Sequence, residues 1–389
     1  MADLATKKKE RNYLLDVLKL VAALFVIMFH FAIRLYGGFK IYPANDLSQA
    51  YYWWYAEFGP FKNVMTMAFY TFTSGYWLMQ RIYKEKRAGF FGRGKDLSMV
   101  GKYFVSNFAT YWPYLFIGGL WGIACLFIAH PTLMENPMNI VYAIKNAMFD
   151  LLGLQSAGYM GYSESLFAHA CNDLSALTNN YTDMSTVFIK YNSPLWYLSA
   201  MVVFAPIIYI VFMKSELAGI VMSILIYSCG NGWLSMNGSG GTSVISADIL
   251  FVGKCAMRLL TPMMLGIWGF YLAEYLKKAK LSDKGRTWIS VFGVFGAVWF
   301  LFLAINGSGY IMMDYPVALL LVMMFSGQGK ITPAVNKVLA KVPGIKSLSN
   351  ISLGLYILHT PLLCVFKFRL MDSFANFSQM QIFGIFMAA

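Results

Sequence analysis

The sequence predicts an all-α protein, a polytopic bundle of transmembrane helices with ten intended spans. Three properties of its 389 residues predict this fold class: 58% are hydrophobic, only 13% are charged, and the mean hydropathy is +0.56. A soluble domain carries about 25% charged residues, and a water-soluble chain of this length could not cover so much apolar surface. The composition therefore excludes an ordinary soluble enzyme, a disordered chain and a collagen-like chain.

A helix needs about 20 apolar residues to cross roughly 30 Å of hydrocarbon. We predict nine full spans, near residues 13–35, 61–80, 103–129, 194–213, 217–235, 254–275, 287–305, 309–325 and 350–366. A tenth begins near Gln379 and has about half of the required length, so we expect the last span to be incomplete. No repeat of fixed period is visible, so residues 13–389 are expected to form one transmembrane domain behind a basic segment, 1–12.

The 31 Lys and Arg residues gather in short clusters between the apolar runs, mainly at 7–11, 81–102, 277–286 and 330–346. Because Lys and Arg favour cytoplasmic loops, we expect a multi-pass protein of the cell membrane with a cytoplasmic N-terminus. Anionic lipid headgroups explain the net charge of +13 better than nucleic acid does. The segment 130–193 then lies outside the cell and contains an amphipathic or re-entrant helix.

Two ionisable residues in the first span are the strongest functional candidates, because such groups are expensive inside a membrane. Lys19 and His30 are separated by ten residues, which is about 16 Å along a helix axis. Taken singly, Lys19 could snorkel to the surface or pair with Asp16, and His30 could simply pack with a hydrogen bond. Together they predict a cation that holds a phosphate-bearing donor and an imidazole that acts as general base.

The second and fourth spans contain further candidates. Ser74 and Gly75 lie in an aromatic run, where they allow a backbone or a ligand to approach closely, and tight helix packing is the alternative. Trp196 and Tyr197 open the fourth span and fit an interfacial aromatic belt. Trp196 is also a candidate for a substrate contact.

The sixth and ninth spans each place an ionisable residue within the membrane. Arg258 lies one turn inside its span and needs an anionic or carbonyl partner, for which Asp314 is one candidate. A structural ion pair and a ligand clamp are both open for Arg258. His359 follows Tyr356 by three residues, on the same helix face, and a second intramembrane histidine makes it less expected that both merely pack.

Four motifs follow one another along the chain in a fixed order. They are the basic-x10-His element from Lys19 to His30, the aromatic-x-Ser-Gly-aromatic element at 72–76, the Leu-Trp-aromatic-Leu element at 195–198, and the Ser-x-Gly-x-Tyr-x-x-His element at 352–359. In these motifs and in its expected topology the chain resembles the acyltransferase family 3 membrane proteins, which O-acylate cell-surface glycans and other acceptors. The resemblance covers nearly the whole chain.

The resemblance implies an acyl-CoA co-substrate, most often acetyl-CoA, on the cytoplasmic side. It also implies a hydroxyl acceptor on an extracytoplasmic glycan or another envelope component, with no bound cofactor and no metal. The catalytic candidates are then His30, as general base, with Ser74, Tyr356 and His359. The substrate-binding candidates are Lys19, Arg93, Lys102, Trp196 and Arg258.

The third span departs from the family pattern. Pro113 and Tyr114 are present, but Asn107 and Thr110 stand where arginines are expected. The CoA phosphates are therefore expected at the basic inner loops, with Lys102 as one of the nearest cations.

Three alternatives stay open on the sequence alone. Transfer could pass through a covalent acyl-enzyme on His30 or Ser74. The chain could instead be a transporter or flippase in which His30, Arg258 and His359 bind a substrate or relay protons. It could also be a structural or sensory membrane protein that has lost its activity.

Overall fold

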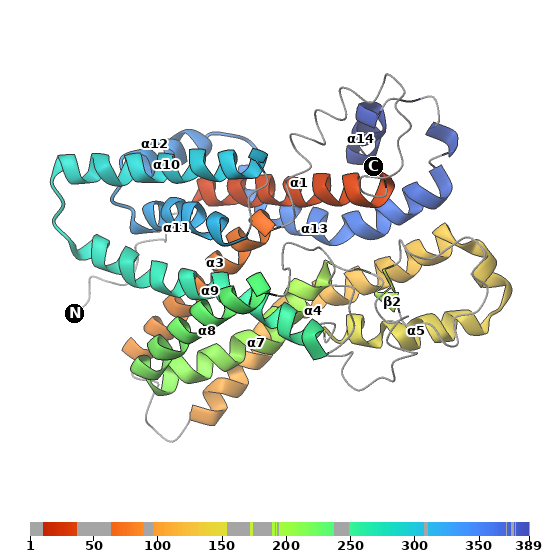
Figure 1. The fold of residues 1–389 in the computed structure, drawn as a ribbon, viewed down its shortest axis with the longest axis horizontal. Coiled ribbons are helices and arrows are strands. Elements are labelled where there is room, and N and C mark those ends of the chain that lie inside the picture. Colours follow the sequence, from red (N-terminus) through yellow and green to blue (C-terminus); the bar gives the residue numbers. More distant parts are fainter. Residues whose placement is uncertain are drawn as a thin grey trace.

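The computed structural model describes residues 11–36, 64–88, 96–153, 172–173, 189–190, 192, 194–236, 249–306, 310–370, 372–374, 377 and 379–388. Apart from one pair of two-residue strands, every regular element in these ranges is a helix, so the all-α class is confirmed (Figure 1). The α-helices are α1 (Tyr13–Tyr36), α3 (Val64–Arg87), α4 (Asp96–Ala129), α5 (Met138–Leu151), α7 (Leu195–Lys214), α8 (Glu216–Met236), α9 (Ile249–Lys278), α10 (Asp283–Asn306), α11 (Tyr310–Ser326), α12 (Ile331–Leu339), α13 (Leu348–Val365) and α14 (Gln379–Ala388). Short helical segments are η1 (Pro131–Glu135), η3 (Ile345–Ser347), η4 (Phe366–Leu370) and η5 (Asp372–Phe374), and strands β1 (Asn172–Asp173) and β2 (Ile189–Lys190) pair in parallel.

Several helices are suited to a bilayer. Within the described ranges, α4, α7, α9 and α13 are long and apolar enough to cross a membrane, and α11 with α12 adds a fifth crossing if their 76° bend lies within one span. Helices α1, α3, α8 and α10 coincide with other predicted spans, and α1 carries the charged residues Asp16 and Lys19. The chain is a helical membrane protein, and the total of ten spans stays a prediction.

Helices α1 and α13 lie side by side and run in the same direction (Figure 1). At the start of α1, the backbone N–H of Leu14 donates to Oδ1 of Asn336, which precedes α13, at 2.9 Å. Toward their other ends, His30 of α1 meets His359 of α13. Helices α1 and α13 coincide with the first and ninth predicted spans, and two odd-numbered spans must cross a membrane in the same direction. Their parallel arrangement therefore supports the predicted order of crossings.

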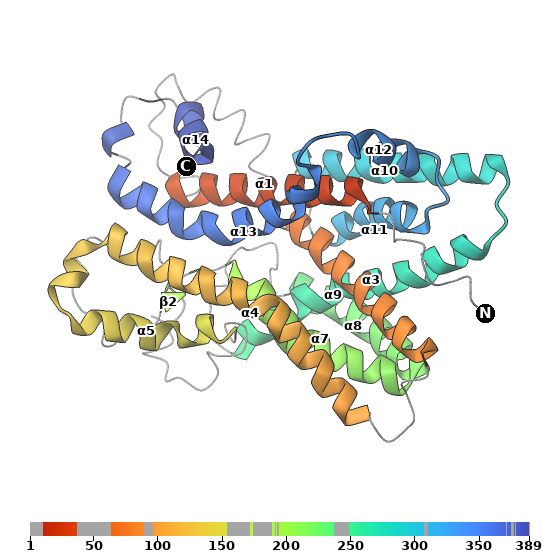
Figure 2. The ribbon, with the colours of Figure 1, turned by 180° about the vertical axis from the view of Figure 1, so that it is seen from behind.

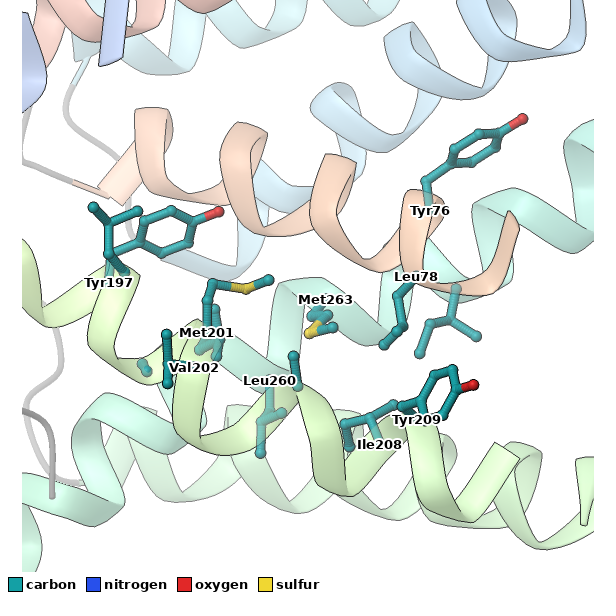
Figure 3. Close-up of a cluster of buried hydrophobic side chains, with 14 of the residues drawn as sticks. Tyr76, Leu78, Tyr197, Met201, Val202, Ile208, Tyr209, Leu260 and Met263 are labelled. Carbon is teal, nitrogen blue, oxygen red and sulfur yellow. The ribbon is translucent and has the colours of Figure 1, made fainter. Parts of the chain in front are cut away.

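Helices α3, α7 and α9 enclose a cluster of buried apolar side chains. Figure 3 shows members of this cluster, including Met201 of α7 and Met263 of α9, gathered below α3. Lipid tails are as apolar as these side chains, so close packing rather than escape from water holds such helices together. The cluster fixes α3, the helix that carries Ser74.

Helix α5 packs along one half of the long helix α4, in the opposite direction (Figure 2). Near the start of α5, buried Asn139 donates to the carbonyl of Leu133 at 2.8 Å. Near its end, Leu151 approaches Gly119, where an added Cβ would lie 2.9 Å from Leu151 Cδ2. The opposite face of α5 exposes apolar side chains such as Val141 and Ile144. The 130–193 segment thus contains a helix with one packed face and one open apolar face.

His130 follows α4 directly and is buried, and among the described residues neither of its ring nitrogens has a hydrogen-bond partner. Its ring centroid lies 4.6 Å from that of Phe368. Burial, together with the positive charge of nearby Arg369, lowers the pKa of His130 to about 4. The ring is therefore neutral in the folded protein at neutral pH.

This burial makes the stability of the fold depend on pH. Between pH 6.5 and 4 the unfolded His130 binds a proton and the folded one does not, so the stabilisation present above pH 6.5 is lost as the pH falls. The free energy of unfolding should fall by up to about 3 kcal/mol across this window. We expect a larger drop in melting temperature from pH 7.5 to 4.5 for the wild type than for His130→Leu, and equal drops would contradict this origin.

Candidate active site

Two histidines that are far apart in the sequence meet inside the bundle. Nδ1 of His30, on α1, lies 2.7 Å from Nε2 of His359, on α13. Their rings stack with centroids 4.9 Å apart and an angle of 20° between the planes. His359 is buried and His30 is half-buried. The structure therefore brings two of the predicted catalytic candidates into direct contact.

The hydrogen bonds of His359 assign the protons of the neutral pair. Nδ1 of His359 lies 3.1 Å from the carbonyl oxygen of Leu355, and a carbonyl only accepts, so Nδ1 carries the hydrogen. Nε2 of His359 is then an acceptor, and it also lies 3.0 Å from the hydroxyl of Thr360. The hydrogen between the rings consequently belongs to Nδ1 of His30, and Nε2 of His30 is the nitrogen with the basic lone pair.

Lys19 lies three turns before His30 and contacts α3. Its Nζ sits over the ring of Trp77, 4.4 Å from the centroid, a cation–π geometry. Its backbone carbonyl accepts a hydrogen bond from the hydroxyl of Tyr70 at 2.6 Å. Asp16, on the same helix, forms an ion pair with Arg11 at 2.7 Å.

Ser74 links α3 to α7 through its hydroxyl. Ser74 Oγ lies 2.9 Å from the carbonyl oxygen of Tyr70, which can only accept, and 2.9 Å from the hydroxyl of Tyr197. Ser74 therefore donates to Tyr70 and accepts from Tyr197. Tyr197 is buried, so its side chain faces the protein interior, and half-buried Trp196 packs edge-on against its ring. The Ser74 hydroxyl is held in a structural network.

Gly75 marks the closest approach of α3 to α9. A Cβ on Gly75 would overlap the carbonyl oxygen of Met263, and a Cβ on Gly266 would overlap the carbonyl oxygen of Phe72. Each helix therefore places a glycine against the backbone of the other. The Ser-Gly element serves tight helix packing here, which was one of the two interpretations of the sequence.

Tyr356 joins α13 to the first turn of α7. Its hydroxyl donates to the carbonyl of Pro194 at 2.8 Å, and its ring centroid lies 6.1 Å from that of His359. Beside it, the buried side chain of Asn192 donates from Nδ2 to the carbonyls of Ile357 and Gly118. These bonds fix the turn of α13 that carries His359.

Aromatic and charged residues cross-link the ends of α3, α4, α7 and α9 away from the histidine pair. Arg81 pairs with Glu85 at 2.9 Å and lies 4.7 Å from the ring centroid of Tyr103. Glu85 also accepts a hydrogen bond from Tyr209.

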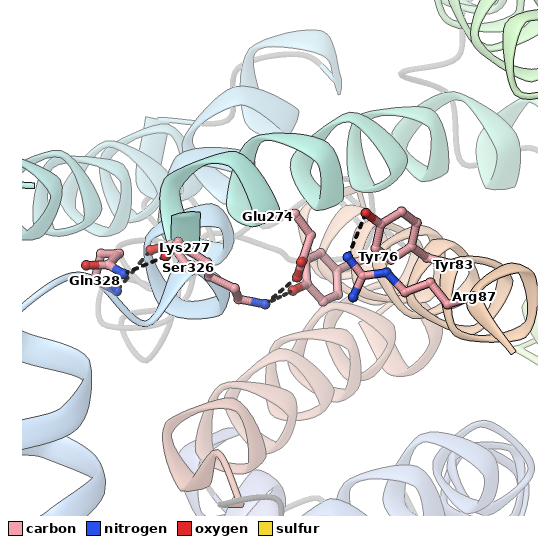
Figure 4. Close-up of polar contacts among 7 residues, drawn as sticks. All are labelled: Tyr76, Tyr83, Arg87, Glu274, Lys277, Ser326 and Gln328. Atoms are coloured by element: carbon pink, nitrogen blue, oxygen red, sulfur yellow. Dashed lines mark hydrogen bonds and ion pairs between the residues drawn. The ribbon is translucent and has the colours of Figure 1, made fainter. Parts of the chain in front are cut away.

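Figure 4 shows a second group of polar contacts at this end. Lys277 contacts Glu274 at 2.7 Å and the Tyr76 hydroxyl at 3.4 Å, and Arg87 donates to the Tyr83 hydroxyl at 3.0 Å. Part of the basic surface predicted for this end is thus already bound within the protein.

The remaining predicted substrate residues lie on other elements or outside the described residues. Lys102 is exposed on α4, and Arg258 is half-buried on α9. Arg93 and the side chain of Asp314 lie outside the described residues. Within the described part of the chain, no three His, Cys, Asp or Glu side chains come together as a metal site.

The third span shows what replaces the expected arginines. Asn107 is buried and donates from Nδ2 to the carbonyl of Met201 at 2.9 Å, which ties α4 to α7. Thr110 is exposed and donates back to the carbonyl of Ser106 at 2.7 Å. Neither position supplies a cation to the interior.

Sequence reasoning missed three residues that organise the site: Tyr70, Asn192 and Thr360. Tyr70 looked like one of many aromatic residues in its span, and nothing local distinguishes it. A signal for Asn192 does exist, because Pro361 follows Ile357 by four residues and must leave its carbonyl without the usual helical donor. This feature of the sequence could have predicted that a donor from elsewhere in the chain binds the Ile357 carbonyl.

Comparison with known proteins identifies the family of this chain. The family model described as an acyltransferase domain, that of acyltransferase family 3, matches residues 12–389. Searches of curated proteins and of solved structures gave no match. The family match covers both histidines, all four motifs and every described transmembrane helix. The chain belongs to acyltransferase family 3 and is a membrane acyltransferase.

Proposed function

We propose that this acyltransferase moves an acetyl group from acetyl-CoA to a hydroxyl of an extracytoplasmic glycan, with His30 as general base. The observation that carries the proposal is the contact between His30 and His359, which leaves Nε2 of His30 as the basic nitrogen. A neutral imidazole of this kind is suited to accept a proton from an attacking hydroxyl near neutral pH.

The proposed transfer is a direct displacement at the thioester. Nε2 of His30 takes the proton of the acceptor hydroxyl while its oxygen attacks the thioester carbonyl. The new C–O bond forms, the C–S bond breaks, and the CoA thiolate takes the proton back from His30. During this cycle Nδ1–H of His30 donates to Nε2 of His359, a bond that strengthens when His30 is positively charged. His359 thus orients the base and stabilises its charged form.

The other catalytic candidates take positioning roles in this proposal. The Ser74 hydroxyl donates to the Tyr70 carbonyl and the Tyr356 hydroxyl donates to the Pro194 carbonyl. Both hydrogens are therefore committed to backbone oxygens, which favours direct transfer over an acyl-enzyme on Ser74. Trp196 and Arg258 lie on helices whose starts we place on the outer side, and we propose them as contacts for the acceptor.

On the donor side we propose Lys19 as a residue that guides the CoA portion, aided by Lys102 and by cations of the inner loops. This assignment places the N-terminus in the cytoplasm and the protein in the cell membrane, where anionic lipids meet the same basic surface. Of these proposed donor contacts, Lys19 alone lies on α1, the helix that also carries the base His30.

Lys19→Met should raise KM for acetyl-CoA about tenfold, with a smaller change in kcat, because it removes one charge-assisted contact to the donor. Lys19→Arg should keep most of the affinity, and Lys102→Met, at an exposed position, should have a smaller effect. Steady-state kinetics at varied acetyl-CoA will measure these changes. An unchanged KM in Lys19→Met would contradict the donor role of Lys19.

The function itself is tested with purified protein, acetyl-labelled acetyl-CoA and envelope polysaccharide as acceptor. We expect label in the polysaccharide for the wild type and none above background for His30→Ala. Transport of unmodified polysaccharide precursor into proteoliposomes, without any label transfer, would instead identify a carrier. Mass spectrometry of surface polysaccharide from cells with and without the gene then identifies the acetylated position.

A further inference from the structure

We infer that Asn192 is a positioning residue for the histidine pair: its side chain replaces the helical hydrogen-bond donor that Pro361 removes from α13. This inference rests on the proposed function, because it assigns Asn192 a part in keeping His359 against His30. The residues concerned come from three separate segments, namely the start of α7, the middle of α4 and the turn of α13 around Pro361.

The need for such a donor follows from covalent structure. In an α-helix the carbonyl of residue 357 accepts from the N–H of residue 361, but Pro361 has no N–H. Ile357 is buried, so water does not readily supply the missing donor. Asn192 Nδ2 lies 2.7 Å from the carbonyl oxygen of Ile357. The amide therefore occupies the place of the missing N–H.

Asn192 is well placed to hold this position. Its side chain is fully buried, and the second hydrogen of Nδ2 points to the carbonyl of Gly118 at 3.2 Å. The backbone carbonyl of Asn192 accepts a hydrogen bond from the backbone N–H of Leu195 at 3.1 Å, at the first turn of α7. Gly118 permits this junction, since a Cβ there would lie 2.7 Å from Ile357 Cγ2. Through its side-chain amide and its backbone carbonyl, this one residue ties α4 and α13 to the first turn of α7.

Neighbouring bonds secure the same turn. Trp121 Nε1 donates to the carbonyl of Leu358 at 3.0 Å, and the Tyr356 hydroxyl donates to Pro194 at 2.8 Å. His359 is the next residue along this turn. Three consecutive residues before it are thus anchored to α4 or to the start of α7, and the His359 ring cannot shift from His30 without disturbing these bonds.

The inference is tested by replacing Asn192 in the wild type and in two Pro361 variants. Asn192→Leu keeps the approximate size of the side chain and removes both donors, and we expect kcat/KM to fall about 10- to 100-fold with little change in KM for acetyl-CoA. Pro361→Ala restores a backbone N–H to Ile357, so in that background Asn192→Leu should cost no more than about threefold. Pro361→Leu restores the same N–H and serves as a second background.

Asn139→Leu is the matched control. Asn139 is likewise a buried Asn that donates to a backbone carbonyl, that of Leu133, but it lies away from α13. Restoring the N–H at position 361 should leave the effect of Asn139→Leu unchanged. Wild-type activity in Asn192→Leu, or equal losses with and without Pro361, would overturn the inference.

Thermal unfolding of the same variants separates this inference from the proposed function. If the wild type transfers no acetyl group, the proposed function fails, but the coupling between positions 192 and 361 can still be measured. We expect Asn192→Leu to lower the melting temperature, and Pro361→Ala or Pro361→Leu to remove most of that loss. Absence of this coupling would reject the role of Asn192 whatever the activity.

Discussion

His30→Ala will lower kcat/KM for acetyl transfer by a factor of about 10² to 10⁴, the range that a positioned general base contributes. The loss should fall mainly on kcat, since the acceptor proton then has no basic nitrogen to receive it. The melting temperature should change little, because His30 is half-buried and its replacement by Ala, a good helix former, leaves the backbone of α1 intact. Steady-state kinetics on the purified variant will measure the change.

Two further variants control this result. His30→Gln keeps a polar side chain of similar length but cannot act as a base at neutral pH, and it should be as inactive as His30→Ala. Melting temperatures of both variants should stay close to that of the wild type, which excludes unfolding as the cause of the loss. Substantial turnover in either variant would remove His30 from the reaction.

Gly75→Ala should cause a large loss of stability for the addition of a single methyl group. The new Cβ would overlap the backbone carbonyl of Met263, and a backbone atom cannot rotate away as a side chain can. Helices α3 and α9 must then separate, which costs about 1–3 kcal/mol or more. The melting temperature should fall by several degrees, and Gly266→Ala should act alike through the Phe72 carbonyl.

Gly101→Ala is the matched control on α4. Apart from the backbone of its own helix turn, nothing lies within 4 Å of a Cβ added there, and Ala is the better helix former by about 1 kcal/mol. This variant should be as stable as the wild type or slightly more so. A melting temperature for Gly75→Ala equal to that of Gly101→Ala would show that the helices do not meet at Gly75.

Much of the fold could be predicted from the length of the apolar segments of the sequence. The predicted span 194–213 became α7, Leu195–Lys214, and the span 217–235 became α8, Glu216–Met236. Apolar length sets these boundaries, so they can be read locally. Apolar length alone does not predict the bend of 76° between α11 and α12, which follows Gly327 at a φ of +65°.

In the candidate site, likewise, the sequence identified individual residues but not the contacts between them. Lys19, His30 and His359 stood out because ionisable residues in apolar helices are costly and need a reason. Their pairing could not be predicted, since His30 and His359 are 329 positions apart and no local pattern fixes which helices touch. For the same reason the contact between the hydroxyls of Tyr197 and Ser74 could not be predicted.

The most direct test of the central claim is a double-mutant cycle of single-turnover acetyl transfer at His30 and His359. If His359 acts only through His30, removing it should slow transfer in the wild type by about tenfold or more, yet His30→Ala with His359→Ala should be no slower than His30→Ala alone. Losses that multiply would mean that the two imidazoles serve separate steps, and the shared proton arrangement would then be wrong.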